Sequence, residues 1–270
     1  MHDRVAVNSL CFKGAPLSEQ AAMWRELTPQ LISFVTSEVF AAGENKAHAI
    51  VREGGYRVAT CSHAFHFGAL PDDEAGWRTP RENLSRAIRF AESVDAESIY
   101  MVTGGRGSRS WEEAAEIFAA AVAPCLPEAE AAGVPIVIET APFFYAGTHL
   151  AHTLTDTITL AEMAGIGVCI DVFSVWSEAG LRKIIERALP ITHLVQVGDY
   201  VLGDNAFPAR AVPGDGDIPL ATILEWIVRG GYTKSFDLEL IGPRIAGEGF
   251  VPAIARSARY VGDILDKLGA

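Results

Sequence analysis

The chain has 270 residues, of which 49% are hydrophobic and 21% are charged, a composition typical of ordinary globular proteins. Acidic side chains outnumber basic ones by 34 to 22, and the formal net charge of −12 argues against nucleic acid or an anionic membrane as the main partner. The N-terminal MHDRVAVNSL lacks the basic and apolar regions of a signal peptide. No apolar stretch reaches the roughly 18 residues of a membrane span. We therefore expect a cytoplasmic protein.

Apolar, strand-like runs alternate strictly with helix-like segments along the chain. We expect strands at about 4–11, 31–39, 57–63, 97–103, 134–140, 167–173, 193–199 and 235–241, and helices at about 17–27, 43–54, 80–94, 111–132, 153–164, 178–188, 219–230 and 250–268. Strict alternation of this kind is typical of a parallel sheet built from βα units. No linker, low-complexity tract or close internal repeat interrupts it, so residues 1–270 are expected to form one domain.

Two helices carry clear boundary signals. Ser110 precedes WEEAAEIFAAAV and is a candidate N-cap, with acidic residues in the first turn that suit the helix dipole. Pro124 and Pro127 are expected to end or kink the fourth helix, because proline lacks the backbone N–H that the helix needs. The four cysteines form no CxxC pair, and we expect them to be reduced and buried.

The competing architecture is a doubly wound open sheet. Such a sheet normally shows a GxGxxG fingerprint after its first strand, but that position reads CFKGAPLSEQ. A (β/α)8 TIM barrel is therefore the predicted fold.

Four oxygen-bearing residues lie at or near the ends of the last four predicted strands: Glu139, Asp171, Gln196 and Glu239. They are 32, 25 and 43 residues apart, which fits consecutive βα units of roughly 30 residues. The carboxyl ends of barrel strands converge on one mouth. Because unpaired buried charges are costly, three carboxylates gathered there need a cation. The all-oxygen donor set suits Mg²⁺ or Mn²⁺ better than Zn²⁺ or Cu²⁺. The alternative is that each carboxylate is separately paired with Arg or Lys.

The runs VIET, CIDVFSVW, HLVQVGD and FDLELIGPR, with the intervening RAVPGDGDIPL, resemble the xylose isomerase-like TIM barrel superfamily, most strongly over about 134–245. This superfamily includes sugar isomerases and epimerases and also inosose and dehydroshikimate dehydratases. The resemblance implies one divalent ion, Mn²⁺ or Mg²⁺, held by Glu, Asp, His and Glu on strands five to eight, with no organic cofactor. It also implies a sugar or polyol substrate and a homo-oligomer.

Glu139, Asp171 and Glu239 match the family's ligand pattern, and by resemblance the two glutamates are also the acid/base pair. Gln196 stands where most members have His, a departure shared with some dehydroshikimate dehydratases. Ser174 replaces the His of a common DxxH motif. His193 is expected on the opposite side of its strand from Gln196, where it is interpreted as a packed or paired histidine.

Further residues are candidates for substrate contact. Arg210 precedes a G-x-G turn, as in many family members, and suits bidentate contact with a hydroxyl or carboxylate. His63 and Trp176 are candidate mouth residues, with His66 a weaker one. The loop 104–109 is either an anion-binding turn or simply a flexible one.

Three functions remain open at this point. The first is an isomerase or epimerase of a keto-sugar or related polyol that acts through an enediolate. The second is a dehydratase of a cyclic keto-polyol, which the glutamine at position 196 favours. The third is a barrel with a degenerate site that binds without turnover. Endonuclease IV shares the barrel, but seven histidines and the negative charge do not suit its zinc cluster and basic face.

Overall fold

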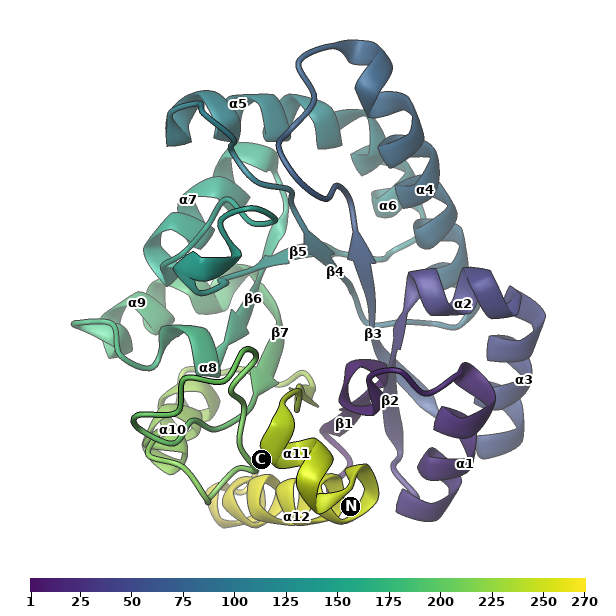
Figure 1. Ribbon diagram of the computed structural model, residues 1–270, viewed down its shortest axis with the longest axis vertical. Helices are drawn as coiled ribbons and strands as arrows, with labels where there is room; N and C mark the ends of the chain where they lie inside the picture. Colours follow the sequence, from purple (N-terminus) through teal and green to yellow (C-terminus); the bar gives the residue numbers. More distant parts are fainter.

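Eight short strands pair in chain order and close into a barrel, in which every neighbouring pair is parallel and β8 returns to β1. Figure 1 shows this barrel surrounded by helices. The computed structural model describes all residues from 1 to 270, and it confirms the (β/α)8 TIM barrel. The strands are β1 Val5–Asn8, β2 Leu31–Val35, β3 Arg57–Ala64, β4 Ile99–Val102, β5 Ile136–Glu139, β6 Gly167–Asp171, β7 Thr192–Val197 and β8 Phe236–Leu238.

Helices follow each strand and cover the outside of the barrel (Figure 1). They are α1 Leu17–Leu27, α2 Thr36–Ala42, α3 Glu44–Gly54, α4 Glu74–Ser93, α5 Trp111–Val122, α6 Leu126–Ala131, α7 Leu154–Ala164, α8 Val172–Val175, α9 Leu181–Ala188, α10 Leu220–Arg229, α11 Pro243–Glu248 and α12 Phe250–Leu268. Short 3₁₀ turns occur at Ser9–Phe12, Ala123–Cys125, Phe143–Tyr145 and Leu189–Ile191. No helix is both long and apolar enough to cross a membrane.

Several predicted boundaries were wrong, and each has a local cause. The predicted strand 31–39 ends at Val35, because α2 follows without a spacer and continues the apolar run. The predicted strand 4–11 ends at Asn8, whose side chain accepts a hydrogen bond from the Leu10 amide and begins a 3₁₀ turn. Helix α4 begins six residues earlier than predicted, because Asp73 caps it.

The fourth predicted helix, 111–132, divides at its prolines into α5, a 3₁₀ turn and α6, as expected for residues without a backbone N–H. Ser110 caps α5 in a complete capping box with Glu113. All four cysteines are free and buried, which confirms that prediction.

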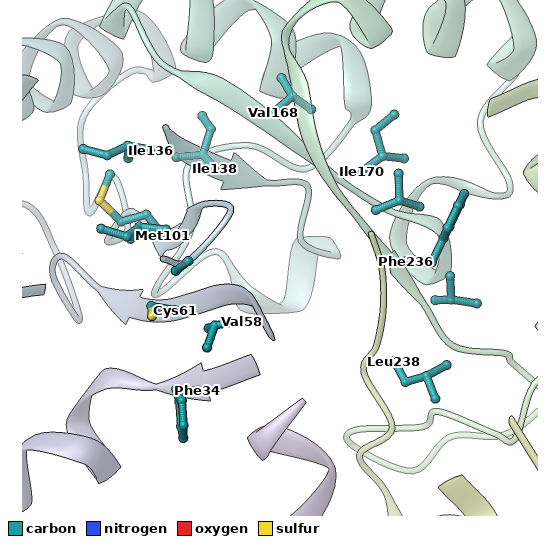
Figure 2. Packing of buried hydrophobic residues seen from close by; sticks show 14 of the residues in the cluster. Phe34, Val58, Cys61, Met101, Ile136, Ile138, Val168, Ile170, Phe236 and Leu238 are labelled. Carbon is teal, nitrogen blue, oxygen red and sulfur yellow. The ribbon is translucent and has the colours of Figure 1, made fainter. Parts of the chain in front are cut away.

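Side chains on the strands alternate between the outside and the inside of the barrel. Figure 2 shows outward-facing residues of this kind, among them Ile138, Ile170 and Leu238, in the cluster that packs the strands against the helices. The inward-facing residues form separate small apolar clusters, one of them Tyr100, Val137, Cys169 and Leu194, and the other Ala6, Leu31 and Ala59. The barrel interior is therefore filled rather than hollow.

The inward positions become polar toward the carboxyl ends of the strands. Glu139 lies two residues beyond inward Val137, and Asp171 lies two beyond inward Cys169. The period of two therefore places the carboxylates inside the mouth, directly above an apolar floor. This transition from apolar floor to polar mouth is what positions the candidate site.

Candidate active site

The four strand-end residues lie at the carboxyl ends of four adjacent strands, at the mouth of the barrel. Glu139, Asp171 and Gln196 lie within β5, β6 and β7, and Glu239 directly follows β8. All four are buried. The Gln196 amide Nε2 donates a hydrogen bond of 2.6 Å to Glu239 Oε2, while its Oε1 accepts one from Cys169 Sγ at 3.2 Å. The convergence expected from strand order and alternation is present.

A fifth residue, Arg210, lies between the carboxylates. Its Nη1 and Nη2 donate to Asp171 Oδ1 and Oδ2 at 3.0 and 2.8 Å, and Nη2 also donates to Glu239 Oε1 at 3.0 Å. Arg210 is itself buried, and a fork of this kind matches the guanidinium to the carboxylate plane. The residue was predicted as a substrate clamp; in this structure its partners are two of the predicted metal ligands.

The donor chemistry of this cluster fits a hard divalent cation, because three carboxylates and one amide supply only oxygen ligands. One guanidinium also leaves a buried group of three carboxylates short of positive charge. In the arrangement seen here, however, the lone pairs of Asp171 and Glu239 are directed at N–H donors, and Gln196 turns its NH₂ group, not its oxygen, toward the cluster. No three carboxylate, imidazole or thiol groups are positioned together to hold a metal ion.

Both glutamates have pKa values raised above the usual range of a carboxyl group. Burial, followed by the charges of Glu239 and Asp171, raises the pKa of Glu139 well above its usual range. Burial raises the pKa of Glu239 to about 7, against the opposing effect of Arg210. A carboxyl group with a pKa near 7 is suited to both accepting and returning a proton.

Two residues that sequence analysis missed hold Glu139. The Tyr100 hydroxyl donates to Glu139 Oε1 at 3.0 Å, and His149 Nε2 lies 3.3 Å from the same oxygen. Burial lowers the pKa of His149 to about 3, so this imidazole is neutral. Tyr100 was identifiable in principle, because it is the inward residue between outward Ile99 and Met101. His149 lies in a loop, and no periodic signal marks it.

Asp171 has partners besides the arginine. The Ser174 hydroxyl donates to its Oδ2 at 2.5 Å, and the Phe173 amide donates to its Oδ1 at 3.2 Å. Asp171 thus caps the short helix α8. Ser174 therefore supports the orientation of this carboxylate.

A cleft of about 650 Å³ opens beside the cluster, between the loops that follow β5, β6 and β7. Trp176 and Ser174 line it, so the cleft shares the Ser174 wall with the carboxylate site. Five further lining residues are aromatic: Phe143, Phe144, Phe173, Tyr200 and Phe207. Phe143, Phe144 and Phe207 are exposed despite their size. Rings of this kind offer flat faces for contact with a ring-shaped ligand.

The other predicted site residues lie away from the cluster. His63 is buried, and its Nδ1 lies 3.0 Å from Thr36 Oγ1; no hydrogen bond or ion pair joins it to the carboxylates. His66 Nε2 lies 3.0 Å from the Ala69 carbonyl oxygen. In the loop 104–109, Arg109 pairs with Asp72.

His193 follows the expectation of a partner-paired residue. Its Nδ1 lies 2.8 Å from Lys234 Nζ, and burial, followed by the lysine charge, lowers its pKa to about 4. It takes no part in the cluster at the mouth.

Comparisons with known proteins agree with this architecture. The sequence model of the family described as xylose isomerase-like TIM barrel matches residues 26–260. Among solved structures, protein SMc04130 from Sinorhizobium meliloti 1021 is 23% identical with a TM-score of 0.84, covering 97% of this chain and 98% of that one. The IolI protein with a zinc atom is 14% identical, with a TM-score of 0.82 and coverage of 98% and 99%.

An L-ribulose 3-epimerase is 17% identical with a TM-score of 0.78, covering 98% of this chain and 95% of that one. At these identities the likeness shows the fold alone. No curated protein matches the chain.

Proposed function

Because the chain belongs to the xylose isomerase-like TIM barrel family, we propose that it is a divalent-metal-dependent isomerase or epimerase of a keto-sugar or related polyol. The observation that carries the proposal is the pair of buried glutamates, Glu139 and Glu239, whose raised pKa values suit proton transfer. Structures of the same fold named as L-ribulose 3-epimerase and D-psicose 3-epimerase support this reaction class.

The proposed reaction moves one proton. Glu139 or Glu239 removes it from the carbon next to the substrate carbonyl, and the other glutamate returns a proton from its own side. Return to the same carbon with opposite hand is epimerisation. Return to the neighbouring carbon, while a second proton passes from the α-hydroxyl oxygen to the former carbonyl oxygen, is isomerisation. A divalent cation in the cluster would polarise the carbonyl and stabilise the negative charge of the enediolate.

The surrounding residues orient the two glutamates. Tyr100 and His149 hold Glu139 from below and beside it, while Gln196 fixes one oxygen of Glu239. The aromatic cleft that contains Trp176 is proposed to take the ring of the substrate. Each of these groups restricts motion of the base relative to the carbon acid, which is where much of the rate gain from positioning arises.

A dehydratase is the second candidate, and Gln196 is the feature that favours it. In a lyase, the same proton removal is followed by loss of a hydroxyl from the neighbouring carbon, which leaves a conjugated product. Substrates of this kind are cyclic keto-polyols such as inosose or 3-dehydroshikimate.

Incubation of the Mn²⁺-loaded protein in D₂O with a panel of ketoses, inosose and 3-dehydroshikimate separates the candidates. Proton NMR detects deuterium at an α carbon, and ultraviolet absorbance detects a conjugated enone. Exchange without absorbance supports the isomerase or epimerase, whereas absorbance replaces it with the lyase. Exchange with none of these substrates, although the protein binds Mn²⁺, would contradict both. Glu139→Gln is the matched inactive control.

A further inference from the structure

The guanidinium of Arg210 has well-matched contacts on several sides. Besides its three hydrogen bonds to Asp171 and Glu239, its guanidinium carbon lies 4.5 Å from the centre of the Phe173 ring, a distance typical of a cation–π contact. A Cβ placed on Gly198 would lie 3.2 Å from Arg210 Nη1 and 3.4 Å from its Cδ. The glycine at the end of β7 therefore leaves room for this side chain.

The guanidinium also contacts the oxygen atoms that a divalent cation would need as ligands. The guanidinium contacts both oxygens of Asp171 and one oxygen of Glu239, and Gln196 Nε2 contacts the other. Each Asp171 oxygen already accepts two hydrogen bonds, one from the guanidinium and one from the Phe173 amide or the Ser174 hydroxyl. A metal ion bound to Asp171 must therefore replace a donor, and the guanidinium is the one that its charge repels.

Resting on the metal site of the proposed function, we propose that Arg210 is the counter-cation of the metal-free site. Binding of a divalent cation displaces its guanidinium from Asp171 and Glu239, and the freed N–H groups then face the mouth, where substrate oxygen atoms enter. One arginine thereby keeps the empty carboxylate cluster paired and becomes available to a ligand once the cluster is filled.

The contacts around Arg210 are compatible with displacement of its side chain. Arg210 belongs to the loop between β7 and α10 rather than to a strand, although its backbone N–H is anchored to the Ile241 carbonyl at 3.2 Å. Asp171 keeps the Ser174 hydroxyl and the Phe173 amide as donors when the arginine leaves. Asp171 therefore remains oriented when the arginine side chain moves away.

Mn²⁺ binding to metal-free protein, followed by the electron paramagnetic resonance signal of free Mn²⁺, tests the competition. We expect Arg210→Met to bind Mn²⁺ at least about tenfold more tightly than the wild type, because the competing cation is gone. Arg256→Met is the matched control, since Arg256 also bridges two carboxylates, Asp215 and Glu248, but on the surface; its Mn²⁺ affinity should equal that of the wild type. Equal or weaker binding by Arg210→Met overturns the proposal, and so does failure of both proteins to bind Mn²⁺.

A second measurement uses the wild type alone and decides the matter if the Arg210 variant does not fold. Phenylglyoxal labelling, mapped by mass spectrometry, should modify Arg210 slowly in EDTA and at least about threefold faster with saturating Mn²⁺, while labelling of Arg256 stays constant. An unchanged rate at Arg210 with Mn²⁺ bound overturns the displacement. Neither readout needs turnover, so a protein that exchanges no substrate proton would contradict the proposed function and leave this inference standing.

Discussion

Asp237 offers the sharpest test of the electrostatics beneath the site. This carboxylate faces the barrel interior one layer below Glu239, where it accepts hydrogen bonds from Asn8 Nδ2 at 2.5 Å and Ser33 Oγ at 2.7 Å. Burial raises its pKa to about 7, although both hydrogen bonds oppose the shift. We predict that Asp237→Asn stabilises the protein at pH 8 and leaves its stability nearly unchanged at pH 4.

The magnitude follows from linkage. The folded protein binds the Asp237 proton more tightly than the unfolded chain does, so this residue makes wild-type stability fall as pH rises from about 4 to about 7. The pKa of about 7, against an ordinary value of 3.8, corresponds to about 4 kcal/mol at 1.36 kcal/mol per pH unit, which is an upper figure. The new amide keeps both contacts, because its oxygen accepts from Asn8 and its NH₂ group can donate to the Ser33 hydroxyl. We therefore expect a gain of about 2–4 kcal/mol at pH 8.

Urea unfolding followed by tryptophan fluorescence, at several pH values from 4 to 8, measures this difference. The gain should grow with pH between about 4 and 7 and then level off. Asp263→Asn, which removes an exposed carboxylate from α12, should show a much smaller change. A gain that is the same at pH 4 and pH 8, or a loss at pH 8, would refute the electrostatic reasoning.

Three other outcomes are expected. Glu139→Gln and Glu239→Gln should each lower the rate of substrate deuterium exchange by about 10²–10⁴-fold, measured by NMR, because each removes a proton carrier. Tyr100→Phe removes an O–H donor to the Glu139 carboxylate, so the pKa of Glu139 should rise and the acid limb of the kcat/KM profile should move up by about 1 pH unit; an unmoved limb would contradict this. Ser110→Ala breaks the capping box with Glu113 and should cost about 1 kcal/mol in urea unfolding without changing the exchange rate.

The fold was predictable from the order of its elements. Strict alternation of strand and helix indicated the parallel barrel, and the position of Glu139 and Asp171 at strand ends predicted that they lie at its mouth. The boundaries were less predictable wherever a helix continues the apolar run of a strand, as at Thr36 and Val172. An apolar run alone does not distinguish a buried strand from the first turn of a buried helix.

The sequence predicted which residues lie at the site better than it predicted which of them contact one another. Arg210 lies in a loop, and its pairing with Asp171 depends on how residues 198–219 cross the mouth, which no spacing encodes. His149 reaches Glu139 from another loop in the same way. His63 shows the opposite case. It lies near the end of strand β3, yet its ring contacts Thr36 and not the carboxylates.

Gln196 offers both a hydrogen-bond donor and an oxygen acceptor to the carboxylate cluster, and an imidazole offers no oxygen. A buried cluster of carboxylates needs positive charge, and Arg210 supplies part of it here, while the glutamine donates its NH₂ to Glu239. Rotation of the amide would exchange the two contacts, turning Oε1 toward the cluster and Nε2 toward Cys169. The amide donates to the arginine-filled cluster, and under the proposed function it would ligate the cation with no change of protonation. A neutral histidine at this position would ligate a metal through its unprotonated ring nitrogen, and that nitrogen has no proton to donate to Glu239.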